Sequence, residues 1–82
     1  MKLESALKQH LTLRDVLILK RLAQAPAHVK ELTCNGLISF GRASQICDKL
    51  KKRRFINRVH DKEDRRSVIV SLSRAGREFM NE

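Results

Sequence analysis

The chain has 82 residues, which is enough for one compact unit with a single core and excludes a second domain. Hydrophobic residues make up 41% of it, and with one proline and three glycines the composition excludes a disordered chain. The 18 Lys and Arg residues against 9 Asp and Glu residues give a net charge of +9, a surplus that predicts a polyanionic partner.

Two helices are predicted in the first third of the chain. Residues 2–9 form a short leading helix with a weak apolar pattern, which needs packing to be stable. A stronger helix follows, because Thr12 and Asp15 have the spacing of a capping box. It ends at Ala25, since the residue before Pro26 avoids helical geometry. Its predicted apolar stripe consists of Val16, Ile18, Leu19, Leu22 and Ala23.

The next two predicted helices are separated by a turn. A short helix over residues 28–34 turns Val29 and Leu32 inward and closes at Asn35 and Gly36, residues that tolerate left-handed geometry. Ser39 caps the longer helix that follows. The predicted buried side of this longer helix is Ala43, Ile46, Cys47 and Leu50, and its outward arc is Gly41, Arg42, Gln45, Lys49 and Lys52. This order is the helix-turn-helix arrangement.

After Arg54 the periodicity becomes alternating, which predicts a β-hairpin. Residues 55–60 and 67–72 are its strands, and the six residues between them are all charged and form a solvated tip. Ser73 caps a last short helix that ends near Met80. We therefore expect a mainly α domain with a small β-hairpin (α+β), a winged helix-turn-helix that takes up the whole chain.

The basic residues are concentrated in the second half of this unit. Nine of the 18 lie between Lys49 and Arg66, where only three acidic residues, Asp61, Glu63 and Asp64, oppose them. A charge run is often only a solvated face. Because this one coincides with a predicted helix-turn-helix and hairpin, binding to phosphates is the interpretation that we favour.

Four segments together resemble the MarR family of bacterial regulators over about Leu11 to Met80. They are Ile46-Cys-Asp-Lys-Leu50, Phe55-Ile-Asn-Arg58, Asp61-Lys-Glu-Asp-Arg-Arg66 and Val70-Ser-Leu-Ser-Arg-Ala-Gly76. The most specific is the charged tip, where the family has an Asp-x-x-Asp-Arg-Arg run followed by a strand, a cap and a glycine. The resemblance implies a winged helix-turn-helix transcriptional regulator whose second motif helix enters the major groove.

By position, the resemblance assigns residues 39–45 and Lys49 to this recognition helix. It assigns the minor-groove arginine of the wing to Arg66, braced by Asp64, with Arg65 as a rival for the same role. A local ion pair is the alternative for the arginine. Arg54 stands where relatives often have the glycine that ends the recognition helix.

The resemblance also bears on assembly. Family members are usually longer, and extended helices at both ends build a homodimer and enclose an effector pocket. Only about ten residues precede the matching region here, and about six follow Gly76. We therefore expect neither dimerisation by the family route nor a small-molecule effector, and the sequence leaves a homodimer formed in another way open.

The residues themselves indicate how double-stranded DNA would be read. Arg42 suits guanine and Gln45 suits adenine, one turn apart on the exposed arc, although both are also ordinary solvated helix residues. Phe40 is a large apolar residue that contacts either a thymine methyl or Cys47, and we favour packing. The complete predicted DNA-binding set is Ser39, Gly41, Arg42, Ser44, Gln45, Lys49, Lys52, Arg53, Asp64, Arg65 and Arg66, in which Ser39, Lys49, Lys52 and Arg53 suit phosphates.

Other chemistries are not indicated. Cys34 and Cys47 are too few and too widely spaced for a metal site or a disulfide framework, and we expect core positions for them rather than redox sensing. The three histidines are scattered, and no nucleophile, base or paired carboxylate suggests catalysis, so we expect no enzyme, metal or cofactor. No apolar run reaches the roughly 20 residues of a membrane span, and we expect a cytoplasmic protein.

Three functions follow from this sequence. The first is a sequence-specific transcriptional regulator. The second is an accessory DNA-binding protein of a plasmid or phage, in replication, transfer or control of another regulator. The third is a winged-helix protein-interaction module with its basic face on an acidic partner. RNA binding is disfavoured, because the chain has no Tyr or Trp and only three Phe residues, and so has few aromatic side chains to stack on exposed bases.

Overall fold

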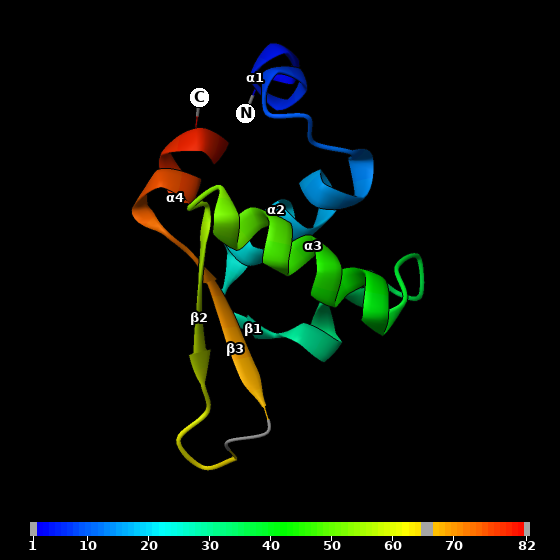
Figure 1. Cartoon of the computed structure of the whole chain (residues 1–82), viewed down its shortest axis with the longest axis vertical. Helices are drawn as coiled ribbons and strands as arrows, with labels where there is room; N and C mark the ends of the chain where they lie inside the picture. The colour runs from blue at the N-terminus through cyan, green and yellow to red at the C-terminus, as the bar shows by residue number, and fades with distance from the viewer. Residues whose placement is uncertain (1, 65–66, 82) are drawn as a thin grey trace.

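A computed structural model describes residues 2–64 and 67–81 of the chain. A body of helices carries a small antiparallel sheet, from which a hairpin extends (Figure 1). In chain order the elements are α1 (Leu3–Lys8), α2 (Leu13–Gln24), β1 (Ala27–His28), the 3-10 helix η1 (Val29–Thr33), α3 (Phe40–Lys52), β2 (Ile56–His60), β3 (Val68–Leu72) and α4 (Arg74–Met80). None of the described helices is both long and apolar enough to cross a bilayer.

The start and end of α2 are as predicted. Thr12 Oγ1 accepts a hydrogen bond from the amide of Asp15 at 3.3 Å, and the amide of Thr12 donates to Asp15 Oδ2 at 2.8 Å, which completes the capping box. Ala25 is extended and ends the helix before Pro26. Of the predicted stripe, Ile18, Leu19 and Leu22 are buried, Val16 is half-buried and Ala23 is exposed.

The segment before α3 differs from the predicted helix over residues 28–34. Ala27 and His28 form β1, which pairs antiparallel with β3, so the hairpin has a third strand that the sequence pattern did not reveal. Two residues are too short to show an alternation. The 3-10 helix η1 then closes with Cys34, Asn35 and Gly36 all at positive φ, one residue earlier than predicted.

Helix α3 is built as its pattern predicts. Ser39 Oγ caps it by accepting a hydrogen bond from the amide of Arg42 at 3.1 Å. Its buried residues are Ala43, Ile46, Cys47 and Leu50. The apolar stripe packs α3 against η1, α2 and the sheet, and the opposite arc is left outside the core.

A Schellman motif ends α3. The amide of Phe55 donates to the carbonyl oxygen of Leu50 at 3.0 Å, and the amide of Arg54 donates to that of Lys51 at 2.9 Å. Arg54 has φ +64, the left-handed geometry that usually falls to glycine at this position. Glycine would adopt this backbone conformation without strain, which accords with the glycine that the resemblance to MarR regulators implies at this position.

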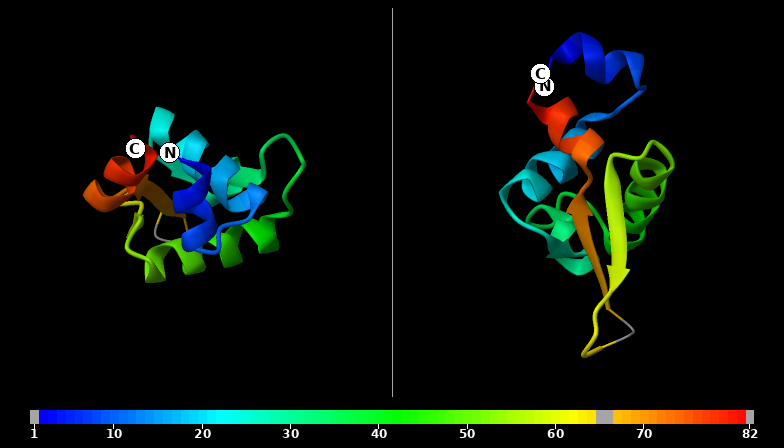
Figure 2. Two further views of the ribbon diagram at one scale, coloured as in Figure 1. Left: turned by 90° about the horizontal axis from the view of Figure 1, so that it is seen from above. Right: turned by 90° about the vertical axis from the view of Figure 1, so that its left-hand side faces the viewer.

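The sheet has the order β1-β3-β2, with β3 in the centre. β2 and β3 pair antiparallel with Ile56 opposite Leu72 and His60 opposite Val68. The wing, defined here as this hairpin with its loop, extends from one end of the molecule, and α1 lies at the other end (Figures 1 and 2).

Helix α4 closes the core over the start of β2. Ser73 Oγ accepts a hydrogen bond from the amide of Gly76 at 3.0 Å and donates to the carbonyl oxygen of Arg54. A Cβ at Gly76 would lie 2.0 Å from the carbonyl oxygen of Phe55, so only glycine allows this approach. The ring of Phe79 stacks on that of Phe55 with centroids 4.7 Å apart.

Substituting Arg54 by glycine should stabilise the protein by about 0.5–1 kcal/mol, because it relieves the left-handed strain of a residue with a Cβ. Urea unfolding followed by circular dichroism measures the change. Lys52→Gly is the matched control: this residue is the last of α3 and exposed, and glycine there should destabilise by about 1 kcal/mol. A loss of stability in Arg54→Gly would show that the turn after α3 is not strained at this residue.

Candidate nucleic-acid interface

The N-terminal half of α3 presents polar side chains to solvent. Arg42 and Gln45 are both exposed, and Arg42 Nη1 donates to Gln45 Oε1 at 3.3 Å. Their guanidinium and amide therefore lie side by side on the outer face of the helix. An α-helix with its side chains is about 10–12 Å across and enters the major groove of B-DNA, which is about 12 Å wide.

The first turn of α3 is open around its glycine. Gly41 is exposed, and a Cβ built there would meet no atom within 4 Å. Neither packing nor backbone conformation in this molecule requires glycine at that position. Its lack of a side chain leaves the backbone of the first turn accessible to an approaching surface.

The prediction that Phe40 packs against the core is wrong. Its ring is 59% exposed, because it precedes the apolar stripe of α3 and points outside the helix-turn-helix. It borders a hollow of about 230 Å³ between η1, α3 and the wing, together with the half-buried Ser44 and with Arg58 and Val68. Ser44 thus lies behind the outer arc rather than on it.

Lys49 departs from the predicted arc. Its Nζ lies 2.6 Å from Oδ2 of the buried Asp15 and donates to the carbonyl oxygen of His10 at 3.0 Å. Arg53, one turn later, donates from Nη1 to Gln9 Oε1 at 3.2 Å. Both basic side chains are half-buried and engaged with the segment between α1 and α2. Lys52, in contrast, is exposed as predicted.

An ion pair that the sequence pattern did not reveal connects α3 with the wing. Arg58 of β2 binds Asp48 of α3 through Nη1 and Oδ1. Both residues stand within the family-like segments, but their sequence separation of ten and their different elements gave no signal of contact. Asp48 is 54% exposed, so it places one negative charge on the outer face of α3. Lys51 is exposed on the same helix and was also not predicted as a site residue.

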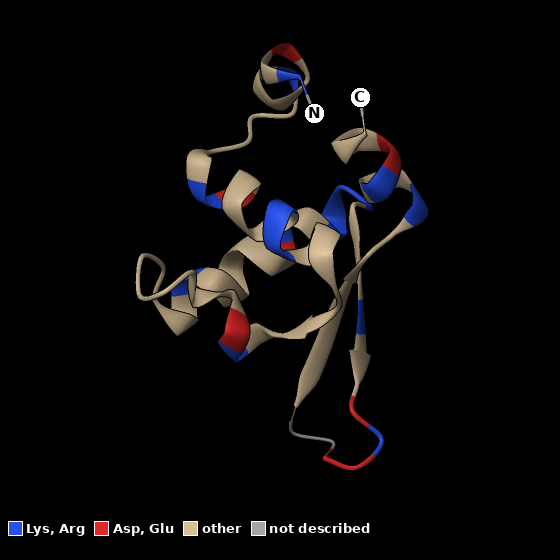
Figure 3. Ribbon diagram, turned by 180° about the vertical axis from the view of Figure 1, so that it is seen from behind, with Lys and Arg blue, Asp and Glu red and all other residues tan. Residues whose placement is uncertain are grey.

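The loop of the wing mixes both charges. Asp61, Lys62, Glu63 and Asp64 follow one another at its start (Figure 3). Asp64 accepts hydrogen bonds from Ser67, at 2.9 Å from its amide and at 3.2 Å from its hydroxyl. The predicted minor-groove residues Arg65 and Arg66 lie outside the described residues, and their roles stay a prediction.

The sequence of residues 2–82 matches the profile of a protein family described as transcriptional regulator SarA/Rot. The chain belongs to the SarA/Rot family of transcriptional regulators. This family consists of regulators and not of enzymes. No curated protein sequence matches the chain.

Solved structures of MarR-type regulators share the fold of this SarA/Rot family chain. YusO from Bacillus subtilis has a TM-score of 0.86 and 26% identity, over 96% of this chain and 57% of that one. MarR has a TM-score of 0.84 and 26% identity, over 95% of this chain and 58% of that one. A MepR-like protein complexed with pseudoligands has a TM-score of 0.83 and 28% identity, over 96% of this chain and 56% of that one. The chain thus spans little more than half of these three, and the resemblance to MarR regulators and the winged-helix fold are confirmed.

The two thiols of this SarA/Rot family domain are not part of the outer face. Burial raises the pKa of the Cys47 thiol from 9.0 to about 11, with a smaller lowering by Arg58 and a smaller raising by Asp48. Cys34 is half-buried and packs against the core. Within the described part of the chain, no three His, Cys, Asp or Glu side chains are placed to hold a metal ion.

Iodoacetamide at pH 8 should label Cys34 in the native protein and leave Cys47 unmodified. With a pKa raised to about 11, only about one Cys47 thiol in a thousand is ionised at that pH, and its sulfur is buried. Mass spectrometry of peptides after a timed reaction measures both. Cys34→Ser should abolish the native labelling, and urea should restore it through Cys47. Rapid native labelling of Cys47 would contradict the packing of α3.

Proposed function

We propose that this chain binds double-stranded DNA sequence-specifically as a transcriptional regulator, with α3 in the major groove and the wing in the minor groove. The observation that carries the proposal is the paired exposure of Arg42 and Gln45. Both lie on the free face of the second motif helix, in a chain whose family is one of transcriptional regulators. The net charge of +9 supports a polyanionic partner.

Base readout is assigned to these two side chains. Arg42 binds O6 and N7 of a guanine, and Gln45 binds N6 and N7 of an adenine. In the free protein, their mutual hydrogen bond holds the two side chains together on the outer face of α3. Phe40, exposed at the end of the helix that enters first, contacts a thymine methyl in this arrangement.

Phosphate contacts surround this centre. Of the cations predicted to contact phosphates, Lys52 is exposed, and Lys51 adds a second exposed charge on α3. Ser39 and the open backbone at Gly41 are placed at the helix start, where amides donate to anions. Ser44 and Arg53, which are both half-buried, are proposed to contact DNA only at the periphery of the interface.

The wing completes the proposed interface. The arginine pair of its loop inserts into the minor groove, with Arg66 as the contacting residue, Arg65 as its rival and Asp64 as its brace. The support is the resemblance of the loop sequence to MarR-type regulators. Asp48 and Arg58 connect this hairpin to α3, so that both reading elements approach the duplex together.

Arg42→Ala should relax base preference, whereas Lys52→Ala should weaken binding to all sequences alike. The first loses a bidentate base contact, worth about 1–3 kcal/mol of discrimination. The second loses a phosphate contact, so the slope of log affinity against log salt becomes about 0.9 less steep. Fluorescence anisotropy with a selected site and a site with one changed base pair, at several salt concentrations, separates the two effects.

Lys20→Ala is the matched control, because it removes the same charge from an exposed position of α2. It should leave both the discrimination and the salt slope near their wild-type values. Equal discrimination in the wild type and in Arg42→Ala would overturn the proposed readout.

Two other outcomes point to the remaining functions. Bound genomic sites that cluster at a replication origin rather than at promoters would favour a plasmid or phage accessory protein. Failure to bind any duplex at about 50 mM salt, where phosphate contacts are strong, would favour a protein-interaction module. A two-fold dimer would require half-sites about one helical turn, or a multiple of it, apart, which footprinting and sedimentation together report.

A further inference from the structure

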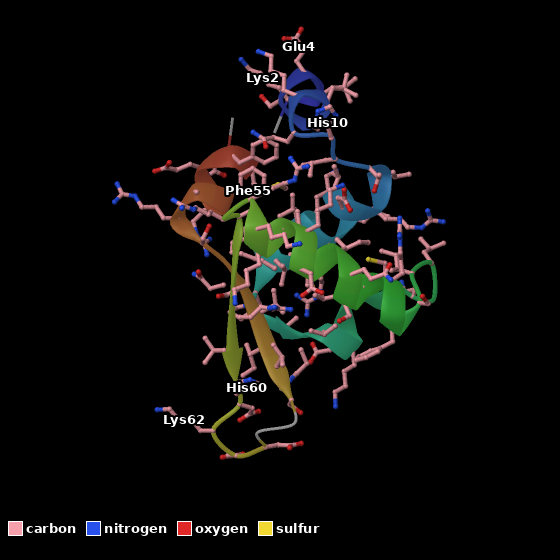
Figure 4. The ribbon with its side chains drawn as sticks, in the orientation of Figure 1. Lys2, Glu4, His10, Phe55, His60 and Lys62 are labelled. Carbon is pink, nitrogen blue, oxygen red and sulfur yellow. The ribbon has the colours of Figure 1, made fainter. Side chains whose placement is uncertain are left out.

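A buried carboxylate holds α3 against the chain that joins α1 to α2. We call residues 9–12 the elbow; His10 marks it in Figure 4, near α1. Asp15, just after the elbow, is 1% exposed. Its Oδ2 accepts the amide of Thr12 at 2.8 Å and lies 2.6 Å from Lys49 Nζ. Lys49 also donates to the carbonyl oxygen of His10 at 3.0 Å.

A second contact one turn along α3 reinforces the first. Arg53 follows Lys49 by four residues, so both side chains lie on one face of α3. Arg53 Nη1 donates to Gln9 Oε1 at 3.2 Å, again at the elbow. Two contacts on one face restrain rotation of α3 about its own axis. Gln45 precedes Lys49 by four residues, and its place on the groove side therefore depends on this rotation.

Asp15 and the carbonyl oxygen of His10 take two of the three N–H donors of Lys49, and moving the 33% exposed side chain outward to a phosphate would break both contacts. The departure of Lys49 would strand the charge of Asp15, which is buried and has no other cation in contact among the described residues. The free-energy cost of a buried carboxylate without a cation is far larger than the free energy gained from one exposed phosphate contact. The ammonium is thus expected to stay with Asp15 when a duplex arrives.

We propose that Lys49 and Asp15 are positioning residues for DNA recognition: their ion pair sets the rotation of α3 at which Arg42 and Gln45 meet the bases, and Lys49 contacts no phosphate. This inference rests on the proposed function, and it takes Lys49 out of the phosphate set. It makes Asp15, which is buried in α2, a determinant of base discrimination.

The test uses the double variant Asp15→Asn/Lys49→Gln in the full chain. One negative and one positive charge are lost, so the net charge stays +9, while the ionic attraction between α3 and Asp15 is removed. Affinity is measured against salt for a selected site and a one-base-pair variant of it. The salt slope should equal that of the wild type, and discrimination should fall about fivefold or more, the lower end of what one base contact supplies.

Lys52→Gln is the reference for a true phosphate contact, and its slope should become about 0.9 less steep. Lys49→Arg keeps the charge next to Asp15 and should retain both slope and discrimination. Thermal melting by circular dichroism checks that the double variant is folded at the assay temperature. If it is not, Asp15→Glu, which retains both charges but displaces the carboxylate by one methylene, takes its place with the same two expected results.

Two results would overturn the inference alone. A slope about 0.9 less steep in the double variant would make Lys49 a phosphate ligand. An unchanged salt slope with unchanged discrimination would show that the ion pair contributes to folding stability and not to base recognition. Absence of salt-dependent duplex binding by the wild type would instead overturn the proposed function, and this inference with it.

Discussion

The burial of one stripe of α3 determines what this molecule can present to a partner. Ala43, Ile46, Cys47 and Leu50 are each no more than 3% exposed, and their packing determines which side of the helix faces the core. Because the helix has 3.6 residues per turn, Arg42 and Gln45 then lie on the outward side, and the proposed role of the Lys49–Asp15 ion pair is to set the rotation within that limit. The proposed reading surface is thus a consequence of core packing.

Two ion pairs from consecutive residues, about 100° apart around the helix axis, then connect α3 to two different parts of the molecule. Asp48 holds Arg58 of the wing, and Lys49 holds Asp15 next to the elbow. The first is partly exposed, and pairs of that kind contribute about 0–1 kcal/mol. In the second pair the carboxylate of Asp15 is buried while Lys49 is 33% exposed, so removing the cation costs only part of the about 3–5 kcal/mol that breaking a fully buried pair costs. The contact of α3 with Asp15 is therefore the stronger of the two, because one of its charges is buried.

Local patterns were sufficient to predict much of this architecture from the sequence. The three caps at Thr12, Ser39 and Ser73, the stop before Pro26 and the buried stripe of α3 all depend on residues within a few positions of one another. Features that depend on distant partners were missed. The strand β1 is two residues long and is defined by β3, more than 40 residues later.

The same limit applies to the candidate site. The exposure of Arg42, Gln45 and Lys52 followed from helical periodicity, but periodicity alone placed Lys49 on the same arc and Phe40 in the core. A signal for the Lys49 contact was present: Asp15 precedes Ile18 and Leu19 by three and four residues, and so lies on the apolar stripe of α2. A carboxylate there requires a cation from elsewhere, although its pattern does not say which one.

The proposed recognition depends on duplex DNA meeting the N-terminal half of α3. The most direct measurement is a titration of the isotopically labelled protein with a duplex that carries a selected site, followed by amide chemical shifts. The largest changes are expected at residues 39–45, with further changes at Asp64 and Ser67 in the wing and small ones along α1 and α4. Changes centred on α1 and α4, with the amides of Arg42 and Gln45 unmoved, would contradict this mode of binding.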